Sequence, residues 1–401
     1  SMDAKGNPVI FTNGDNDTFP LWYNQETEGV RTDARVCNLS YLQTDWYIDQ
    51  MRRPAYDSPS LPINWTRLQY VTGTREGIPV QPDALQQVID YYKDSPEDLK
   101  QMLGDNPYEL KNIIRHWVLN DNPDLQIFPT DSIVVTVDKE AVKRSGMMIA
   151  ADSIPDVMHI SLKGKRAVYK SEMMMLEMIS QANWERPLYM STTVGPDNYG
   201  HLGDNFVQEG LACRITPFDT KQSGRTIDSE RMYNNMMNKF KYGGLKENPD
   251  IYLDETVIRM CYTHRRLFNQ LAQQLLKEGQ KDKALKVLQR AEEEIPGSIV
   301  PHEAFYGHSL ELADAWLALG HKAEAEKLLN AVGQNAREYI EWYLSLNTQR
   351  LLQSSRECLM QIYILNDIAK TWEPIDKKKA ETYRMEVNNY ASRCHQRGMS
   401  L

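Results

Sequence analysis

The feature that most constrains the fold of this chain is an alternation of strand-like and helix-like stretches through its first half. Short runs rich in β-branched and apolar residues are typical of buried strands. Such runs lie at residues 9–12, 35–39, 131–137, 158–162, 186–192 and 212–215. Amphipathic stretches separate many of these runs, as expected when helices join the strands. The pattern predicts an α/β domain over residues 1–218 with a mostly parallel sheet.

Two helices inside this domain are predicted from local composition. Residues 169–183 form a methionine-rich helical pattern, in which methionines recur at spacings typical of core packing. These methionines are Met173, Met174, Met175 and Met178. A second, short helix is predicted at residues 205–211, before the last strand-like run of the domain.

From residue 254 onward the hydrophobic periodicity is helical, and one stretch matches the tetratricopeptide pattern. The matching residues are Phe268, Leu271, Ala272, Leu275, Ala284, Leu288, Ala291 and Pro296. A second copy contains Leu312, Ala313, Trp316, Ala325 and Leu329, with an insertion predicted at residues 299–306. We predict an all-α tetratricopeptide-like domain at residues 254–401 and an extended connecting segment at residues 219–253. Such repeats hold a polypeptide on their concave face, or they buttress a neighbouring domain.

Composition excludes several classes of function. The net charge of −9 argues against a nucleic-acid partner, because protein surfaces that bind nucleic acids are basic and neutralise the phosphates. No apolar run approaches the roughly 18–20 residues that a membrane-spanning helix needs. The five cysteines and eight histidines are dispersed, with no zinc-ligand spacing and no disulfide framework. We therefore predict no metal site built on histidine or cysteine.

An acidic stretch after the first strand is the candidate site. Its predicted substrate-binding residues are Asn13, Asp15, Asn16, Asp17 and Thr18, with Trp22 and Tyr23 as candidate stacking surfaces. Pro20 suits the first position of a helix and Gly29 its end, so Asp15, Asp17 and Thr18 are expected in the turn before that helix. Strand, turn and helix form the commonest place for a site in an α/β domain.

Three interpretations of this acidic stretch remain open at the level of sequence. It can be an Asx turn that satisfies loose backbone N–H groups. Asp15 and Asp17 can instead hold a divalent cation through hard oxygen ligands. The third interpretation is an aspartate-nucleophile phosphatase, but Asn13 and Gly14 separate the first aspartate from the strand end, which is atypical of those enzymes.

Several motifs together resemble one family. They are Asn-Gly-Asp-Asn-Asp-Thr-Phe-Pro-Leu-Trp-Tyr at residues 13–23, and the stretches 35–40, 186–189, 209–212, 240–244 and 252–255. The chain resembles the soluble C-terminal region of large multi-spanning membrane proteins of Bacteroidetes. That family is similar to transmembrane protein O-mannosyltransferases and has a GT-C-type N-terminal half. The resemblance covers nearly the whole chain, and it is weakest beyond residue 335.

The resemblance implies a function that composition does not. The natural protein would carry a transmembrane N-terminal half as partner, and this region would lie on the periplasmic side of the cytoplasmic membrane. The expected activity of the parent is transfer of a sugar from a lipid carrier to Ser or Thr of an exported protein. The catalytic carboxylate would lie in the membrane half, so this region would be an acceptor-binding accessory, inactive alone and without a cofactor.

The alternative is a stand-alone soluble enzyme. It would be a metal-dependent transferase or phosphohydrolase that uses Asp15 and Asp17 with a divalent cation, and the helical repeats would be a scaffold. No nucleophile, general base or second pair of carboxylates can be placed beside the acidic stretch from the sequence. Sequence therefore favours the accessory region and identifies no catalytic residue.

Overall fold

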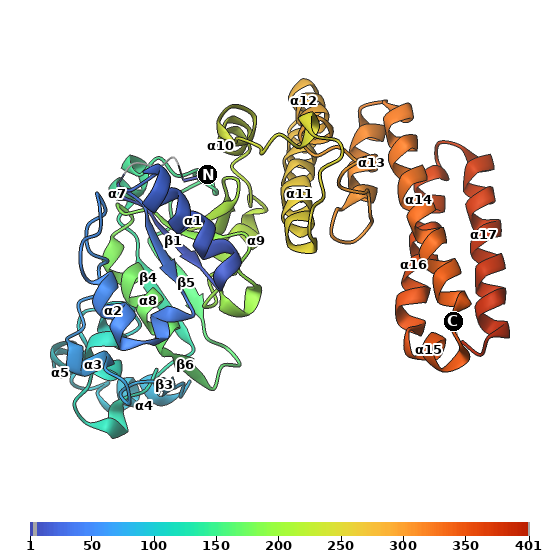
Figure 1. Cartoon of the computed structure of the whole chain (residues 1–401). Helices are drawn as coiled ribbons and strands as arrows, with labels where there is room; N and C mark the ends of the chain where they lie inside the picture. The colour runs from blue at the N-terminus through green and yellow to red at the C-terminus, as the bar shows by residue number, and fades with distance from the viewer. Residues whose placement is uncertain (3–5, 400–401) are drawn as a thin grey trace. The chain divides into compact units, whose positions relative to one another are not determined.

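The computed structural model describes residues 1–2 and 6–399 (Figure 1). In its main sheet, three neighbouring strands pair in parallel. The sheet has five strands in the order β2-β1-β7-β9-β8. Their bounds are β1 Val9–Thr12, β2 Arg35–Asn38, β7 Leu188–Ser191, β8 Phe206–Gln208 and β9 Ala212–Ile215. Strand β1 pairs in parallel with β2 and β7, whereas β9 pairs antiparallel with β7 and β8. The predicted α/β class is confirmed, with a mixed sheet that is parallel through β2, β1 and β7.

Both faces of this sheet are covered. Val9 and Phe11 of β1 join the large core that includes α8 (Lys170–Ala182). Ile10 points the other way and packs with Leu21 of α1 (Asp15–Glu28). Successive side chains on a strand alternate between faces, so a strand covered on both sides reads as one continuous apolar run. This explains why the sequence of β1 shows no polar alternation.

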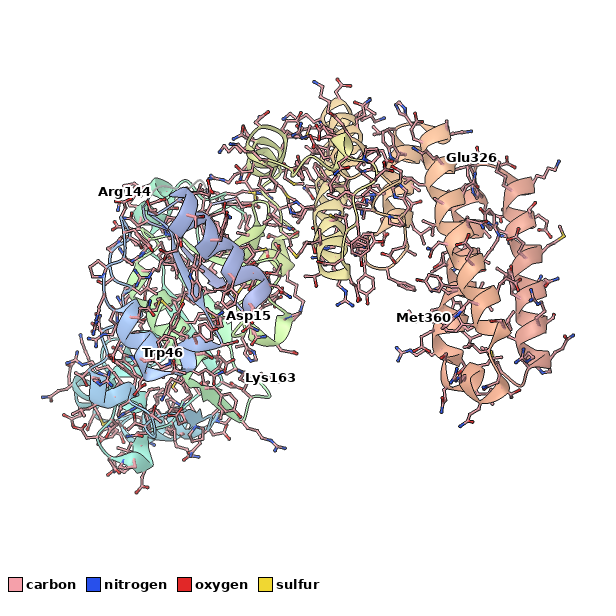
Figure 2. All side chains as sticks on the ribbon, in the orientation of Figure 1. Asp15, Trp46, Arg144, Lys163, Glu326 and Met360 are labelled. Carbon is pink, nitrogen blue, oxygen red and sulfur yellow. The ribbon has the colours of Figure 1, made fainter. Side chains whose placement is uncertain are left out.

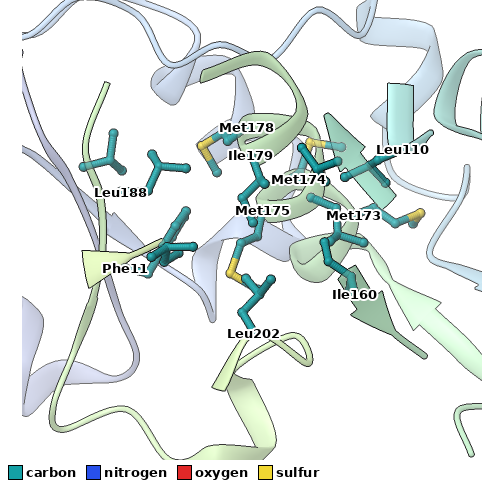
Figure 3. Close-up of a cluster of buried hydrophobic side chains, with 14 of the residues drawn as sticks. Phe11, Leu110, Ile160, Met173, Met174, Met175, Met178, Ile179, Leu188 and Leu202 are labelled. Atoms are coloured by element: carbon teal, nitrogen blue, oxygen red, sulfur yellow. The ribbon is translucent and has the colours of Figure 1, made fainter. Parts of the chain in front are cut away.

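The methionines of α8 form the centre of the larger core, as predicted. Met173, Met174, Met175 and Met178 are all buried. Figure 3 shows them between Phe11 and Leu188 of the main sheet on one side and Leu110 and Ile160 on the other. Flexible thioether side chains fill the irregular space between elements of different orientation, which accounts for their number here.

Two further strand pairs lie outside the main sheet. Strands β4 (Ser132–Thr136) and β5 (Val157–Ser161) pair with each other antiparallel, as do β3 (Gly77–Pro79) and β6 (Ala167–Tyr169). The short helices of this part are α2 Asp45–Met51, α3 Arg67–Tyr70, α4 Ala84–Tyr91, α5 Pro96–Leu103, α6 Leu110–Ile113, α7 Lys139–Arg144, α9 Thr220–Ser223 and α10 Ser229–Asn234. The strand-like runs at residues 131–137 and 158–162 are therefore strands, but they do not extend the parallel sheet.

Two local predictions are wrong. Helix α1 begins at Asp15, so Asp15, Asp17 and Thr18 lie in its first turn and Pro20 lies inside it. Gly14 makes this early start feasible, because its φ of 84° turns the chain from β1 directly into the helix. Gly29 ends the helix in the left-handed conformation, as expected. The helix predicted at residues 205–211 is strand β8 instead, which gains ladder hydrogen bonds by pairing with β9.

The second part of the chain is all-helical, as predicted. Its helices are α11 Glu255–Lys277, α12 Lys281–Glu294, α13 Ser309–Ala318, α14 Lys322–Ser345, α15 Thr348–Gln353, α16 Ser355–Trp372 and α17 Lys377–Gln396. They pack chiefly as the pairs α11 with α12, α13 with α14, and α16 with α17. The small residues Ala272, Ala284 and Ala313 of α11, α12 and α13 are fully buried.

The chain divides into two compact units, Ser1–Met232 and Tyr233–Leu401. Residues 219–253, expected as one connecting segment, are shared between them. The part before Tyr233 belongs to the α/β unit, and the short turn at Leu245–Glu247 packs against α12 of the helical unit. Among residues 1–2 and 6–399, no helix is long and apolar enough to cross a bilayer.

Candidate functional site

Three parallel strands place their carboxyl ends at one edge of the main sheet. The ends are Thr12 of β1, Asn38 of β2 and Ser191 of β7. The chain runs from β1 to β2 on one side, and it returns on the other side of β1 to form β7. Such a reversal of strand order opens a crevice at the carboxyl ends, which is where open α/β sheets bind ligands. We call this region the carboxyl edge.

Asp17 links two strand ends at the carboxyl edge. Its Oδ2 accepts a hydrogen bond from the backbone N–H of Asn13 at 3.0 Å and from the hydroxyl of Thr193 at 2.8 Å. Thr193 Oγ1 lies 2.6 Å from Ser191 Oγ at the end of β7. The side chain of Asp17 is only 7% exposed. A buried carboxylate with such partners holds the start of α1 between β1 and β7.

Thr18 and Asn38 make the matching link to β2. Thr18 Oγ1 lies 2.8 Å from Thr12 Oγ1 and accepts a hydrogen bond from Asn38 Nδ2 at 2.9 Å. The same amide group donates to the carbonyl of Gly14 at 3.2 Å, and Asn38 Oδ1 accepts from the backbone N–H of Tyr41 at 3.1 Å. Thr12, Thr18 and Asn38 are all fully buried. This network fixes the first turn of α1 over the carboxyl edge.

The remaining polar residues of the stretch face outward. Asp15 and Asn16 are exposed at the start of α1, and Asn13 is half-buried with its Oδ1 accepting from Ser40 at 2.6 Å. Figure 2 marks Asp15 at this end of α1. The first turn of a helix carries a partial positive charge, so a carboxylate is favoured there. The predicted residues therefore fall into a buried pair, Asp17 and Thr18, and an accessible pair, Asp15 and Asn16.

A row of aromatic rings borders the carboxyl edge. The rings of Phe19 and Trp22 stack at 5.7 Å, those of Trp22 and Tyr41 at 6.3 Å, and Tyr41 and Trp46 lie 5.9 Å apart. Phe19 and Trp46, at the two ends, are 46% and 54% exposed. Tyr23, the other predicted stacking residue, is exposed on α1. We call Phe19, Trp22, Tyr41 and Trp46 the aromatic row.

A hollow of about 390 Å³ lies beside the carboxyl edge. Its walls come from the segment after β2, the loop between β5 and β6, the start of α8 and the loop after β7. Its polar lining residues are Gln43, Lys165, Tyr169, Ser171, Glu172, Asp197 and Asn198. Lys165 pairs with Glu172. Amides, carboxylates and a tyrosine offer hydrogen-bond donors and acceptors to a ligand that carries several hydroxyl groups.

Burial keeps two titratable groups at the carboxyl edge in their neutral forms near neutral pH. Burial raises the pKa of the Cys37 thiol to about 12, so it is not a thiolate nucleophile near neutral pH. Burial also raises the pKa of Tyr47, whose hydroxyl accepts a hydrogen bond from the backbone of Asn38. No group of three or more His, Cys, Asp or Glu residues that could hold a metal ion occurs in the described part of the chain.

Sequence reasoning missed most of the partners at this site. Ser40 and Thr193 come directly after strand-like runs, and Asn38 is the last residue of β2. Polar residues at the ends of strands are a recognisable signal when the strands are parallel. Lys165 and Glu172 carry no such signal, because they lie in the loop before β6 and in α8, whose positions depend on the tertiary fold. Among the predicted residues, the structure connects Asn13, Asp17 and Thr18 to this network, and Trp22 to the aromatic row.

The class that emerges is an α/β domain with a polar site at the carboxyl ends of parallel strands, followed by an all-helical unit. Residues 1–235 match the family model for TMEM260-associated domain 2, and the chain belongs to that family. The carboxyl edge, the aromatic row and the hollow all lie within the matched residues. The family is associated with a membrane protein. A search of curated proteins and a search of solved structures each found no match.

Proposed function

We propose that this chain is the extracytoplasmic, acceptor-binding region of a membrane glycosyltransferase similar to the protein O-mannosyltransferases. The observation that carries the proposal is the carboxyl edge, where a buried hydrogen-bond network supports an accessible carboxylate and an exposed aromatic row. The match to a membrane-protein-associated family supports the setting.

The chemistry of the edge suits a ligand rich in hydroxyl groups. The side chain of Asp15 can accept hydrogen bonds from hydroxyl groups, and the half-buried Asn13 can both donate and accept them. Aromatic faces pack well against the C–H faces of sugar rings and against extended peptide backbone. A serine or threonine segment that receives a sugar, or the sugar itself, presents these groups. The rigid network under α1 keeps the contacting residues in place before the ligand arrives.

In this proposal the chemistry belongs to the rest of the parent protein. A GT-C-type transmembrane half on the N-terminal side would bind the lipid-linked sugar and supply the catalytic carboxylate. The chain described here would lie on the periplasmic side in Bacteroidetes and would be inactive alone. Its helix pairs would be tetratricopeptide-like repeats, and they would hold the acceptor polypeptide. The burial of Ala272, Ala284 and Ala313 supports the repeat arrangement.

The alternative, a metal-dependent transferase or phosphohydrolase that uses Asp15 and Asp17, receives less support. These residues lie two positions apart on a helix, where side chains do not face each other. Asp17 is buried and bonded to Thr193, whereas Asp15 is exposed. A cation would need both carboxylates on one side. Turnover of phosphoesters or sugar nucleotides by the isolated chain with a divalent cation would restore this alternative.

The proposal is tested by removing accessible groups of the edge in the full-length parent protein. Asp15→Ala and Trp46→Ala should each lower the rate of sugar transfer to exported proteins by roughly 10-fold, a loss typical of an important contact residue. Tyr91→Ala is the matched control, because Tyr91 is an exposed aromatic residue on α4 that lies outside the aromatic row. Mass spectrometry of exported glycopeptides gives the readout. Unchanged transfer in both edge variants, at normal protein levels, would overturn the proposed role of this site.

A further inference from the structure

A second hollow, of about 500 Å³, lies within the helical unit. Its walls are α11, the connection between α12 and α13, the second half of α14, and α16. Figure 2 marks Met360 of α16, which belongs to its lining. The connection between α12 and α13 contains the predicted insertion at residues 299–306, so the wall comes from a departure from the regular repeat. We call this hollow the tyrosine groove.

Aromatic side chains dominate the tyrosine groove. It is lined by Tyr262, Phe305, Tyr306, Tyr339 and Tyr343. Phe305, Tyr306 and Tyr339 are 43%, 64% and 47% exposed, although they come from two different segments of the chain. The rings of Tyr339 and Tyr343 lie 6.5 Å apart on successive turns of α14. Large aromatic residues that stay exposed around one hollow mark an interaction surface.

The insertion wall of the groove is held in position before any ligand binds. Arg265 is fully buried and donates to the carbonyls of Ile295 at 2.9 Å, Val300 at 2.8 Å and Pro301 at 3.2 Å. The Tyr262 hydroxyl also donates to the carbonyl of Pro301, at 3.1 Å. A wall fixed in this way loses little conformational entropy when a ligand binds.

The lining of the groove contains two carboxylates together with its aromatic rings. Its charged lining residues are Glu303 and Glu357. Two arginines outside the lining lie over two of its rings, Arg259 at 6.0 Å from the centroid of Tyr306 and Arg265 at 5.8 Å from that of Tyr262. Glu303 accepts hydrogen bonds from the backbone N–H groups of Phe305 and Gly307, so it shapes the wall. Glu357 is exposed at the start of α16, where it can meet a ligand. Rings with adjacent carboxylates attract a cationic side chain through both charge and cation–π contacts.

We propose that the tyrosine groove binds an extended polypeptide segment in which a lysine or arginine stands beside prolines. Proline-rich segments form a polyproline II helix with little entropy left to lose, and aromatic-lined grooves recognise that shape. The cationic side chain meets Glu357 and the ring of Tyr339. This inference deepens the proposed function. Peptide binding in the groove stands by itself, and only the identification of the bound segment as a glycosylation acceptor rests on the proposed function.

The test uses a short fluorescein-labelled peptide of alternating proline and lysine, and its fluorescence anisotropy with the whole chain. Tyr339→Ala and Tyr306→Ala should each raise the Kd about 10-fold, as expected for aromatic anchors. Glu357→Gln should raise it several-fold and reduce its dependence on salt. Tyr363→Ala is the matched control, because Tyr363 is an exposed tyrosine on α16 outside the groove lining. Its Kd should equal that of the unaltered chain.

Several results would overturn the inference. They are the absence of peptide binding, equal binding of a peptide with glutamate in place of lysine, and a Kd unaffected by both Tyr339→Ala and Tyr306→Ala. Self-association of the chain that Tyr339→Ala abolishes would assign the groove to a second copy and would also overturn it. Because Tyr306 is exposed on a loop, its variant keeps the test decisive if Tyr339→Ala fails to fold. If mutation of the carboxyl edge abolished glycosylation but the tyrosine groove bound no peptide, this inference would be contradicted and the proposed function would not.

Discussion

At the scale of single residues, Asp15 and Asp17 show how position separates two identical side chains. Both lie in the first turn of α1, where the helix dipole favours a carboxylate. Asp17 is buried and accepts hydrogen bonds from Asn13 and Thr193, whereas Asp15 is exposed. Asp17 therefore stabilises the carboxyl edge, and Asp15 is available to a ligand.

Replacing these residues should have different effects on stability. Asp17→Ala leaves the N–H of Asn13 and the hydroxyl of Thr193 without their acceptor, so we expect the α/β unit to lose about 1–3 kcal/mol. Asp15→Ala removes only an exposed charge at a helix start and should cost less than about 1 kcal/mol. Amide hydrogen exchange of β1 measures the opening free energy of this unit. Equal losses in the two variants would contradict the assignment of Asp17 as the structural carboxylate.

At the scale of secondary-structure elements, helix α1 contains a proline in its interior, although the sequence predicts this proline at the start of the helix. Pro20 lies well inside the helix, so one backbone hydrogen bond is missing and its ring crowds the preceding turn. The anchors of the first turn, Asp17 and Thr18, explain why the helix begins early in spite of this cost. Tertiary hydrogen bonds outweigh a local preference here.

Replacing Pro20 should therefore stabilise the α/β unit. An interior proline costs about 3 kcal/mol relative to alanine, and the stiffer unfolded chain returns about 0.4–1 kcal/mol, so Pro20→Ala should gain about 2 kcal/mol. Pro96→Ala is the control, because Pro96 lies at the start of α5, where proline is well tolerated. Urea denaturation of both variants provides the comparison. A loss of stability in Pro20→Ala would mean that the proline ring makes contacts that matter more than the missing bond.

A carboxylate and an imidazole lie close together where α12 meets the connection to α13. Oε2 of Glu292, on α12, lies 3.3 Å from Nε2 of the buried His302. Burial alone would raise the pKa of Glu292, but the interactions with His302, Lys327 and Arg265 outweigh burial and lower it to about 2. The folded protein therefore favours the charged form of this carboxyl more strongly than the unfolded chain does.

This pKa shift predicts an acid-dependent stability of the helical unit. Because the folded pKa is depressed, the stabilisation is complete above the ordinary value of 4.5 and disappears as the pH falls toward about 2. Glu292→Gln should be less stable than the unaltered chain at pH 7, and this difference in stability should vanish as the pH approaches about 2. Glu338→Gln, at an exposed position on α14, is the control. Urea denaturation at several pH values would show a constant difference for Glu292→Gln if the charge of this carboxyl were unimportant.

At the scale of the whole molecule, the chain combines an α/β unit that carries the polar carboxyl edge with a helical unit that carries the tyrosine groove. The first of these belongs to a family associated with a membrane protein. The net charge of −9 is consistent with a basic polypeptide partner and unfavourable for nucleic acid. In the proposed function, these two surfaces recognise the acceptor, and the chemistry belongs to the rest of the parent protein.

Fractionation of cells with an antibody to this chain checks the proposed setting. We expect a membrane-bound band far heavier than a chain of 401 residues, and we expect external protease to cleave the epitope-bearing part. The physical reason is that the proposed parent anchors this region through its transmembrane half. A periplasmic marker and a cytoplasmic marker control for intact membranes. A soluble band of the size of this chain would contradict the proposed parent and favour the stand-alone enzyme.

The sequence by itself determined the fold class, the helical second half and much of the core. Periodicity is a local property, so it identifies β1, α8 and the buried faces of the α11 and α12 pair without knowledge of their partners. The positions that face inward along these elements, such as Met174, Phe268 and Ala284, are buried as their spacing predicts.

Only the tertiary structure decided how these elements meet and what their polar residues do. Strands β4 and β5 look like members of the main sheet, but pairing depends on distant partners, and they pair with each other instead. The start of α1 and the burial of Asp17 depend on Asn38 and Thr193, which lie far away along the chain. The two hollows form where separate segments converge. Local patterns carry no information on such long-range contacts, so the proposed binding surfaces form only in the folded chain.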